Sequence, residues 1–531
     1  MTLRRTAQRQ SRPQSQVVKP IEWVAPIGGW RTDVPLSEMP PTAAAKLINF
    51  FPEAGFIRAR NGSQPWLTGI LSTIKTLMPY FGATQQMFAG IDGPTPGIFD
   101  ASFAGAVGAS LFTITNAYLS FANFVNAGGH WLVCVNGSDT PFLYNGSTWA
   151  STAITGTNPQ GNPLVPTNLS VVANYRSRLW FLEQGTTNLW FLPTDAITGA
   201  AQALNLGDVM RFGGVPIALN TWTMQVYTGV QQMLCIMTNK GELIIYSGSD
   251  PTTSTNWSLL GTFKLADPLG LDRCMYQIGG DLAVMTENGI VPASKAITLD
   301  PSASDQAAMT KAIGPTWLQT VQSIGEHTAG WQFITYPERR MALVNVPDPA
   351  LGIYQYVMNT ETLAWTQFSG MPATSWAVFN DGLFFGTAGN GVWQADIGSS
   401  DGGAAIDCLS VGAWQRLNDG LAPKSTTLIG VDCIIDTNAM IYGGASFDYM
   451  PKVPFALGVS GVTVSAALWD ISLWDQALWS GTQSVRLIAD ASGEGVVFAP
   501  TVRALINGNA STPTQCQILG GAIYVQVGSG I

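Results

Sequence analysis

The sequence predicts a mainly β protein built around a β-propeller of about six to eight blades. The first observation is the spacing of turn residues: 57 Gly and 31 Pro are spread over 531 residues and separate short apolar runs. Such runs, bounded by Gly, Pro, Asn or Asp, are typical of short strands. The second observation is a hairpin-like unit that returns every 42 to 59 residues, close to the roughly 40–50 residues of one propeller blade.

The hairpin-like unit is an apolar strand, a turn rich in Gly, Asn or Asp, and a second apolar strand. Its copies lie at Met87–Phe99, Trp131–Tyr144, Arg178–Phe191, Met233–Tyr246, Leu282–Val291, Met341–Met358 and Leu383–Asp396. A blade has four strands, so each hairpin supplies half a blade. In two copies the turns Asn145–Thr148 and Asn359–Thr362 lead to Trp149 and Trp365. We expect an outer hairpin there, in which the Asn and Thr side chains bond the backbone and the Trp packs between sheets.

The chain is expected to divide into three segments: a basic extended arm at residues 1–20, the propeller at residues 21–404, and a β-rich platform or tip domain at residues 405–531 that packs on the propeller. The repeat ends near Asp401-Gly402-Gly403. Strand-like runs continue beyond it at Leu428–Ile435, Ser484–Ile488, Gly495–Phe498 and Ala522–Val527. Trp469, Trp474 and Trp479 follow neither a helical nor a strand period and predict an anchored loop.

Few segments favour helix. The candidates are Ser302–Ile313, Pro315–Ile324 and Thr42–Ile48, the last of them directly after a Pro-Pro pair. The stretch from Ala101 to Ser138 carries no charge, but Gly and Asn interrupt it and apolar residues alternate with Thr. We therefore expect buried strands there and not a membrane helix. No apolar segment follows the basic N-terminus, so we expect no signal peptide.

The charge is low and unevenly distributed. Charged residues make up 11% of the chain, against about 25% in an average protein, while 46% is hydrophobic, which excludes a disordered chain. The net charge is −9, and the first twenty residues carry Arg4, Arg5, Arg9, Arg12 and Lys19 with no acid, so the remaining residues carry −14. An acidic body argues against tight wrapping of nucleic acid, because phosphate binding needs Lys and Arg. It is compatible with a channel in which DNA slides.

The cysteines and histidines point to structure and not to chemistry. Cys134, Cys235, Cys274, Cys408, Cys433 and Cys516 form no C-x-x-C pair, and we expect buried free thiols from a reducing compartment. With only His130 and His327, histidine metal sites and nucleophilic triads are nearly excluded.

We therefore expect no catalytic, cofactor-binding or metal residues, no cofactor, and no enzyme activity. No nucleophile elbow, Walker loop, H-E-x-x-H or Rossmann fingerprint occurs. Asp281, Glu287, Glu338 and Asp396 could still form a carboxylate pair in space, but we expect them to be solvated turn residues. Glu338-Arg339-Arg340 falls between two predicted strands, where a hairpin turn is expected.

Several segments of the chain resemble segments of one and the same protein family. Ile48–Glu53 followed by Gly55–Arg60 looks like an opening strand and turn, although Arg60-Asn61-Gly62 stands where the family often has Arg-Pro-Gly. The further segments are Tyr175–Phe181, Gly241–Gly248, Tyr354–Thr360 through Trp365, and Gly520–Val525. Together they resemble the podovirus packaged-DNA stabilisation proteins, or tail nozzles, of short-tailed bacteriophages. The resemblance covers most of the chain.

The resemblance implies a structural virion protein that forms a homohexameric ring below the head-to-tail connector or adaptor protein. In that role it extends the DNA conduit, retains packaged DNA and allows its ejection. Genomic DNA passes the lumen without sequence-specific binding, and tail fibre, spike or needle proteins are further partners. The implied location is the virion tail, assembled in the bacterial host cytoplasm without a membrane anchor. The matching motifs concern backbone and packing, so no catalytic residues carry over.

Three expectations accompany this reading. The basic arm docks on a neighbouring chain or on the connector. The lumen of the ring is acidic or neutral, because a wall of Lys and Arg would hold the DNA in place. Retention then needs a physical gate, formed by another protein or by Gly-rich loops such as Gly389–Gly391 or those near Asp401–Gly403.

Two other functions remain open on the sequence alone. One is a propeller-type receptor- or glycan-binding tail adsorption protein, since Trp residues are abundant. The other is a glycoside hydrolase on a propeller.

Overall fold

The computed structural model describes residues 18–226, 229–253, 255–298, 307–417, 422–436, 438–455, 459–460, 484–508, 513 and 515–527. Arg4, Arg5, Arg9 and Arg12 of the predicted arm lie outside the described residues, as do Trp469, Trp474 and Trp479.

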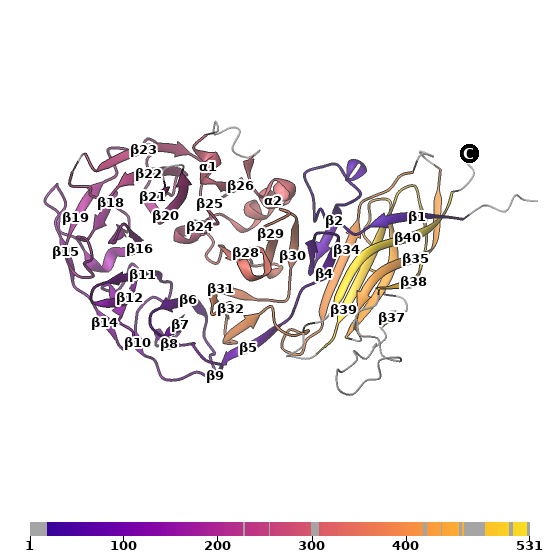
Figure 1. Cartoon of the computed structure of the whole chain (residues 1–531), viewed down its shortest axis with the longest axis horizontal. Coiled ribbons are helices and arrows are strands. Elements are labelled where there is room, and N and C mark those ends of the chain that lie inside the picture. Colours follow the sequence, from indigo (N-terminus) through magenta and orange to yellow (C-terminus); the bar gives the residue numbers. More distant parts are fainter. Residues whose placement is uncertain are drawn as a thin grey trace, which may run out of the picture.

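The described chain is mainly β and contains a β-propeller of seven sheets (Figure 1). We number the blades in chain order. Blade 1 consists of β6 (Ile74–Phe81), β7 (Gln85–Ile91), β8 (Gly97–Asp100) and β10 (Phe112–Thr113). Blade 2 consists of β11 (Ser120–Asn126), β12 (Gly129–Val135), β13 (Phe142–Tyr144) and β14 (Trp149–Ser151). Blade 3 consists of β16 (Leu169–Tyr175), β17 (Arg178–Glu183), β18 (Asn188–Phe191) and β19 (Gly199–Asn205), with β15 (Ile154–Gly156) at its edge.

The remaining blades follow the same plan with local variations. Blade 4 consists of β20 (Pro216–Val226), β21 (Gly229–Thr238), β22 (Glu242–Gly248) and β23 (Trp257–Lys264). Blade 5 has three strands, β24 (Met275–Ile278), β25 (Asp281–Thr286) and β26 (Gly289–Pro292). Blade 6 consists of β27 (Gln332–Tyr336), β28 (Met341–Asp348), β29 (Gly352–Asn359) and β30 (Trp365–Phe368). Blade 7 consists of β31 (Ala373–Phe379), β32 (Gly382–Thr387), β33 (Val392–Ala395), β5 (Ser63–Thr68) and β9 (Gly105–Ala106).

The fold class predicted from the repeat is confirmed. Each of the seven predicted hairpins is the pair of second and third strands of one blade, from β7 and β8 in blade 1 to β32 and β33 in blade 7. The expected Asn turns also form: the Asn145 and Asn359 side chains accept hydrogen bonds from backbone amides two and three residues further on. These turns connect the third and outer strands of blades 2 and 6.

The ring closes through a strand from the start of the chain. β5 pairs antiparallel with β33, so residues that precede blade 1 complete blade 7. Gly391 makes this closure possible, since a Cβ there would lie 1.9 Å from the Leu67 carbonyl oxygen and its φ is +75°. Because β5 runs on into blade 1, its pairing with β33 joins the last blade to the first.

The helices differ in part from the prediction. α2 (Gly314–Ile324) forms where Pro315–Ile324 was predicted, and it buries Trp317 and Val321. Of Ser302–Ile313, residues 302–306 lie outside the described part, and the remainder contains the 3-10 turn η5 (Lys311–Ile313). α1 (Ala293–Ala296) was not predicted. The other 3-10 turns among the described residues are η1 (Leu36–Glu38), η2 (Pro166–Asn168), η3 (Leu271–Cys274) and η6 (Pro337–Arg339).

A β-sandwich lies beside the propeller (Figure 1) and uses both ends of the chain. One sheet contains β1 (Lys19–Val24), β3 (Phe50–Glu53), β4 (Phe56–Ala59), β40 (Cys516–Val527), β35 (Lys424–Ile435) and β38 (Ser484–Gly495). The other contains β2 (Ala44–Ile48), β34 (Ile406–Gly412), β39 (Phe498–Ile506), β36 (Ala439–Phe447) and β37 (Val459–Ser460), and continues into β30 of blade 6.

The sandwich changes two of our sequence-based assignments. Within residues 19–59, expected in the arm and the propeller, β1, β2 and β4 pair with C-terminal strands, as in Lys19 opposite Val525. The expected helix Thr42–Ile48 is wrong: β2 pairs with β34, because tertiary pairing overrides the helix propensity of Ala and Lys. The described part of the segment 405–531 packs against blade 6 together with these N-terminal strands.

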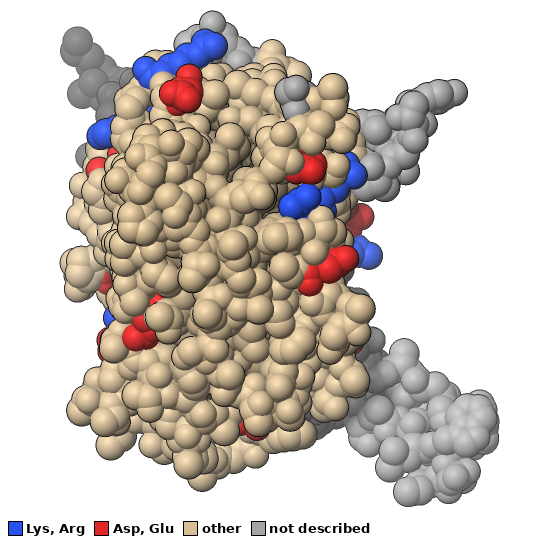
Figure 2. All heavy atoms as spheres, turned by 90° about the vertical axis from the view of Figure 1, so that its left-hand side faces the viewer, with Lys and Arg blue, Asp and Glu red and all other residues tan. Residues whose placement is uncertain are grey.

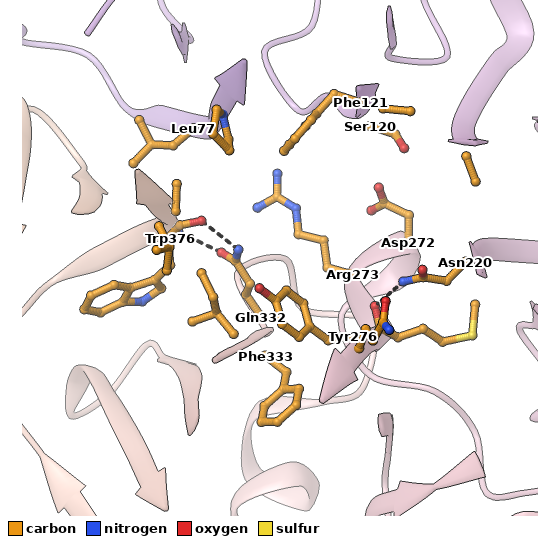
Figure 3. Close-up of a pocket in the computed structure, with 18 of the residues that line it drawn as sticks. Leu77, Ser120, Phe121, Asn220, Asp272, Arg273, Tyr276, Gln332, Phe333 and Trp376 are labelled. Atoms are coloured by element: carbon orange, nitrogen blue, oxygen red, sulfur yellow. Dashed lines mark hydrogen bonds between the residues drawn. The ribbon is translucent and has the colours of Figure 1, made fainter. Parts of the chain in front are cut away.

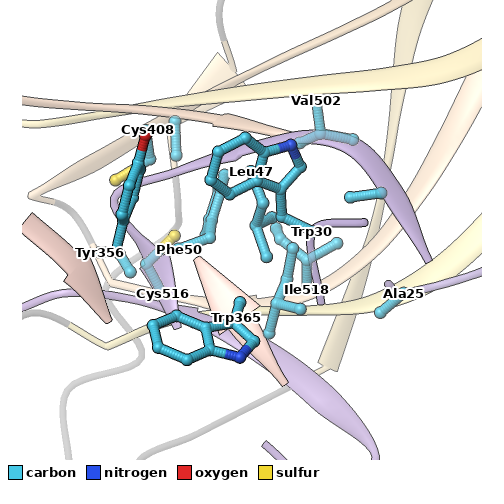
Figure 4. Packing of buried hydrophobic residues seen from close by; sticks show 14 of the residues in the cluster. Ala25, Trp30, Leu47, Phe50, Tyr356, Trp365, Cys408, Val502, Cys516 and Ile518 are labelled. Carbon is cyan, nitrogen blue, oxygen red and sulfur yellow. The ribbon is translucent and has the colours of Figure 1, made fainter. Parts of the chain in front are cut away.

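One hydrophobic core joins the sandwich to blade 6. Tyr356 and Trp365 of blade 6 pack with Phe50, Val502 and Ile518 of the sandwich (Figure 4), and all five are nearly inaccessible to solvent. The six cysteines are free and buried, and burial raises the pKa of their thiols, that of Cys433 to about 12.

The uncharged stretch Ala101–Ser138 is only partly the pair of buried strands that we expected. β11 and β12 pair over their full length. However, the side chain of Phe103 is 77% exposed and that of Leu111 is 48% exposed. The two short strands of this stretch lie at outer edges, β9 in blade 7 and β10 in blade 1. No helix of the described chain is long and apolar enough to cross a membrane.

Candidate functional site

A cavity of about 1260 Å³ lies on the axis of the propeller. The innermost strand of every blade contributes to its wall: β6, β11, β16, β20, β24, β27 and β31. Charged side chains in the wall are Asp272, Arg273 and Asp381, and the other lining residues are apolar or carry amides and hydroxyls. The cavity is therefore a polar but nearly uncharged compartment.

Many polar groups of the wall bond one blade to the next. Gln332 of blade 6 exchanges two hydrogen bonds with the Trp376 backbone of blade 7, at 3.0 and 2.9 Å (Figure 3). Asn220 of blade 4 donates to the Met275 carbonyl of blade 5 at 3.0 Å. Ser120 of blade 2 accepts from the Val172 amide of blade 3 at 3.2 Å. These groups are committed to holding the blades together, so they are not available as reacting groups.

A side chain from blade 5 reaches the opposite wall. Arg273 lies on η3, and its guanidinium points across the cavity towards Leu77 and Phe121 (Figure 3). It donates to the Lys75 carbonyl at 3.0 Å and to the Thr76 hydroxyl at 2.8 Å, both on β6 of blade 1. In a ring of seven blades, blade 5 faces the gap between blades 1 and 2. Arg273 therefore ties opposite walls together.

Tyr118 and Asp272 make a second tie beside Arg273. The Tyr118 hydroxyl, on the connection into blade 2, donates to the Asp272 carboxylate at 2.7 Å. The Arg273 guanidinium lies 4.2 Å from the centre of the Tyr118 ring, within the range of a cation–π contact. We call Thr76, Tyr118, Asp272 and Arg273 the axial latch.

Burial sets the protonation of the axial latch. It raises the pKa of the Asp272 carboxyl, against the opposing effect of Arg273. It also raises the pKa of the Tyr118 phenol well above its usual range, and the neighbouring Asp272 adds to this. The phenol therefore stays a hydrogen-bond donor at neutral pH.

The local backbone explains how η3 presents Asp272 and Arg273. Gly270 precedes η3 with φ +85°, and a Cβ there would lie 2.9 Å from the Trp331 carbonyl oxygen. Only glycine fits this turn easily. Leu271 follows in the same left-handed region, at φ +55°, and turns the next two side chains towards the axis.

The acids singled out in the sequence do not come together. Asp281 bonds Ser294 in blade 5, and Asp396 pairs with Arg339 at 2.7 Å. Glu287 lies in the turn between β25 and β26, and Glu338 lies in η6, the turn expected at Glu338–Arg340. No hydrogen bond or ion pair joins any two of these four. His327 is exposed beside Glu326, and His130 is exposed on β12.

Among the described residues, no group of three His, Cys, Asp or Glu side chains is placed to hold a metal ion.

The axial latch could not be predicted from the sequence. Its members come from three distant segments, and no local pattern links Tyr118 with a residue 154 positions later.

No family model matches this chain, and no curated protein matches it. Solved structures that resemble it are propellers with low sequence identity. YCF48 bound to D1 peptide is 12% identical, with 63% of this chain and 97% of that chain covered, at a TM-score of 0.35. YCF48 from Cyanidioschyzon merolae is 9% identical, with 64% and 98% covered and a TM-score of 0.35. The Aleuria aurantia lectin, a six-bladed propeller, is 9% identical, with 54% and 91% covered and a TM-score of 0.27.

Proposed function

We propose that this chain is a structural subunit of the tail of a short-tailed bacteriophage, the nozzle that extends the DNA conduit below the connector. In this role six copies form a ring, retain the packaged genome and later let it pass. The role needs no catalysis. The proposal starts from the family resemblance of the sequence and gains support from two features of the described structure.

The observation that carries the proposal is a surface with little charge and many exposed apolar side chains. On the propeller side opposite the sandwich, charged residues are isolated spots in an uncharged surface (Figure 2). Large apolar side chains stand out on loops and edges: Leu351 is 82% exposed, Leu71 90% and Phe103 77%. Protein interfaces are depleted of charge in their buried core, whereas a lone soluble protein keeps a charged surface. This surface suits a subunit with several neighbours.

The second feature concerns the path of the DNA. Arg273 starts from η3 on the blade 5 side of the axial cavity and hydrogen-bonds β6 on the opposite wall, so one side chain spans the cavity. A double helix cannot pass there without breaking the axial latch. In our proposal the conduit therefore runs between the copies of the ring, and the propellers form its wall.

The loop near Asp401, expected as a gate, is held in another way. Asp401 pairs with the buried Arg60 at the junction of propeller and sandwich. A gate formed by this loop would have to break that pair, so we assign retention of the DNA to other loops or to a further protein.

Native mass spectrometry of the full chain, alone and mixed with its connector, tests the proposal. We expect six copies, at least in the presence of the connector. A variant without residues 1–17 is the matching test of the arm, because it leaves β1, which begins at Lys19, intact. This variant should melt like the full chain but assemble poorly. A chain that stays monomeric with the connector would contradict the nozzle role.

A further inference from the structure

A second hollow, of about 630 Å³, lies between blades 3 and 4. Its wall is formed by the end of β16, the turn into β17, and the segment between β22 and β23. This volume is within the range of small-ligand sites, roughly 300–1,000 Å³. We call it the interblade pocket.

The interblade pocket combines two cations and one acid on a protein with a net charge of −9. The cations are Arg176 and Arg178, and the acid is Asp250. Arg176 is exposed; its guanidinium lies beside the Tyr175 hydroxyl, whose pKa burial raises and this guanidinium lowers, and no ion pair holds it among the described side chains. The pocket thus has room for one negative group of a ligand.

Arg178 is fixed in place but not saturated. Its side chain is 13% exposed, it donates to the Leu192 carbonyl at 3.3 Å, and its guanidinium lies 5.9 Å from the Phe191 ring centre. The nearest Asp250 oxygen is 3.6 Å away, which is too long for a good hydrogen bond. The Nε of Arg178 is buried without a hydrogen-bond partner. The Nε is closed to solvent, so an acidic ligand group would meet the part of the Arg178 side chain that lines the pocket.

The turn that carries Arg176 is strained. Arg176 and Ser177 have φ values of +51° and +54°, a conformation that hairpin turns usually give to Asn and Gly. Strain of this kind is concentrated at functional sites. The turn holds both arginines at the same pocket.

The rest of the wall is suited to hydroxyl groups. Its remaining side chains are neutral amides and hydroxyls, with no aromatic or aliphatic member: Asn174, Ser177, Thr194, Gln232, Ser249 and Asn256. Such a wall does not favour an apolar ligand. A nucleic acid is also disfavoured, because phosphate binding needs several cations in a row and Asp250 repels a polyanion.

We propose that the interblade pocket binds an acidic saccharide. The carboxylate or sulfate of the sugar pairs with the guanidinium groups of Arg176 and Arg178. The ring hydroxyls bond the amides of the wall and donate to Asp250. This function goes beyond the nozzle role, since a ring can form without it.

A glycan array with uronate, sialylated and sulfated saccharides next to neutral ones tests the proposal on the full chain. Matched pairs then follow by calorimetry: the monosaccharide galacturonate against its methyl ester, sialyllactose against lactose, and the phosphodiester dT3 as a separate arm. We expect binding of an acidic saccharide and none of its neutral partner.

Arg176→Asn is the decisive variant, because Asn tolerates the left-handed backbone. It should weaken binding by about tenfold to a hundredfold, the usual effect of a lost hydrogen bond to a charged group. Arg340→Asn is the matched control: Arg340 is also an exposed turn arginine, at φ +54°, on blade 6. It should bind like the natural chain, and both variants should melt normally.

Three results would overturn the proposal: no acidic saccharide bound on the array, equal binding by Arg176→Asn, or dT3 bound as tightly as the acidic sugar. The symmetry of the assembly tests the nozzle role independently, so failure of one idea does not decide the other.

Discussion

Arg60 donates to both oxygens of the Asp401 carboxylate, at 3.0 and 2.5 Å, and only 2% of its side chain is exposed. The same guanidinium donates to Asn49 and to the Ser369 carbonyl. Arg60 follows the last N-terminal strand of the sandwich, Ser369 connects blades 6 and 7, and Asp401 leads from the propeller to the sandwich. One buried side chain therefore fixes both chain connections between the two parts, together with the link between blades 6 and 7.

Arg60→Met should destabilise the protein by about 3–5 kcal/mol, because removal of one partner leaves a largely buried carboxylate without its cation. Urea unfolding followed by Trp fluorescence measures this. Arg340→Met is the control, since the Arg340–Glu361 pair is 69% and 57% exposed and such pairs contribute about 0–1 kcal/mol. Equal losses in the two variants would show that the junction has no special role.

A second prediction concerns the contact between blades 3 and 4. Trp180 is fully buried and stacks on Trp257, with ring centres 5.3 Å apart and planes 12° from parallel. Trp180→Ala should cost about 3–5 kcal/mol of unfolding free energy, as large aromatic truncations in cores do. Leu351→Ala, at an 82% exposed site, should change stability by about 0.5 kcal/mol or less. A loss below 1 kcal/mol for Trp180→Ala would contradict this packing.

The third prediction is a pH dependence. Burial raises the pKa of Asp272 in the folded chain, above its ordinary value of about 3.9. At a pH between the pKa of Asp272 in the unfolded chain and its raised pKa in the folded chain, the folded chain binds more protons. The stability that protonated Asp272 contributes at low pH is therefore lost as the pH rises. Asp272→Asn cannot titrate. The melting temperature of the natural chain should therefore fall relative to that of Asp272→Asn as the pH rises from about 3.9 through this window.

Tyr118→Phe is the control for this measurement. It removes the hydrogen bond to Asp272 but keeps the buried carboxyl, whose burial is the main cause of the shift. Its melting temperature should follow the pH as that of the natural chain does. A constant difference between the natural chain and Asp272→Asn at every pH would contradict a shifted Asp272.

The sequence revealed the propeller because its evidence is local and repeated. Each hairpin, such as Arg178–Phe191, shows strand, turn and strand within about fifteen residues, and seven copies strengthen one another. Pairings between distant segments leave no such pattern. β1 lies against β40 at the other end of the chain, and Ala44–Ile48 has residues that favour helix until β34 lies beside it.

The candidate sites were hidden for the same reason. Tyr118, Asp272 and Arg273 are ordinary residues in sequence and meet only because the ring brings blade 5 opposite blades 1 and 2. In the interblade pocket, Arg176 and Arg178 are two positions apart in sequence, but Asp250 and Asn256 join them from the next blade. Sequence spacing cannot show which loops of neighbouring blades face each other.

The central claim is that copies of this chain surround a conduit that lies outside each propeller. Electron cryomicroscopy of the full chain assembled with its connector tests it most directly. We predict a six-fold ring whose lumen runs between subunits, with Arg273 still bonded to Thr76 across each propeller. A single copy on the tail axis, or a conduit that passes through the axial cavity of a propeller, would contradict the account.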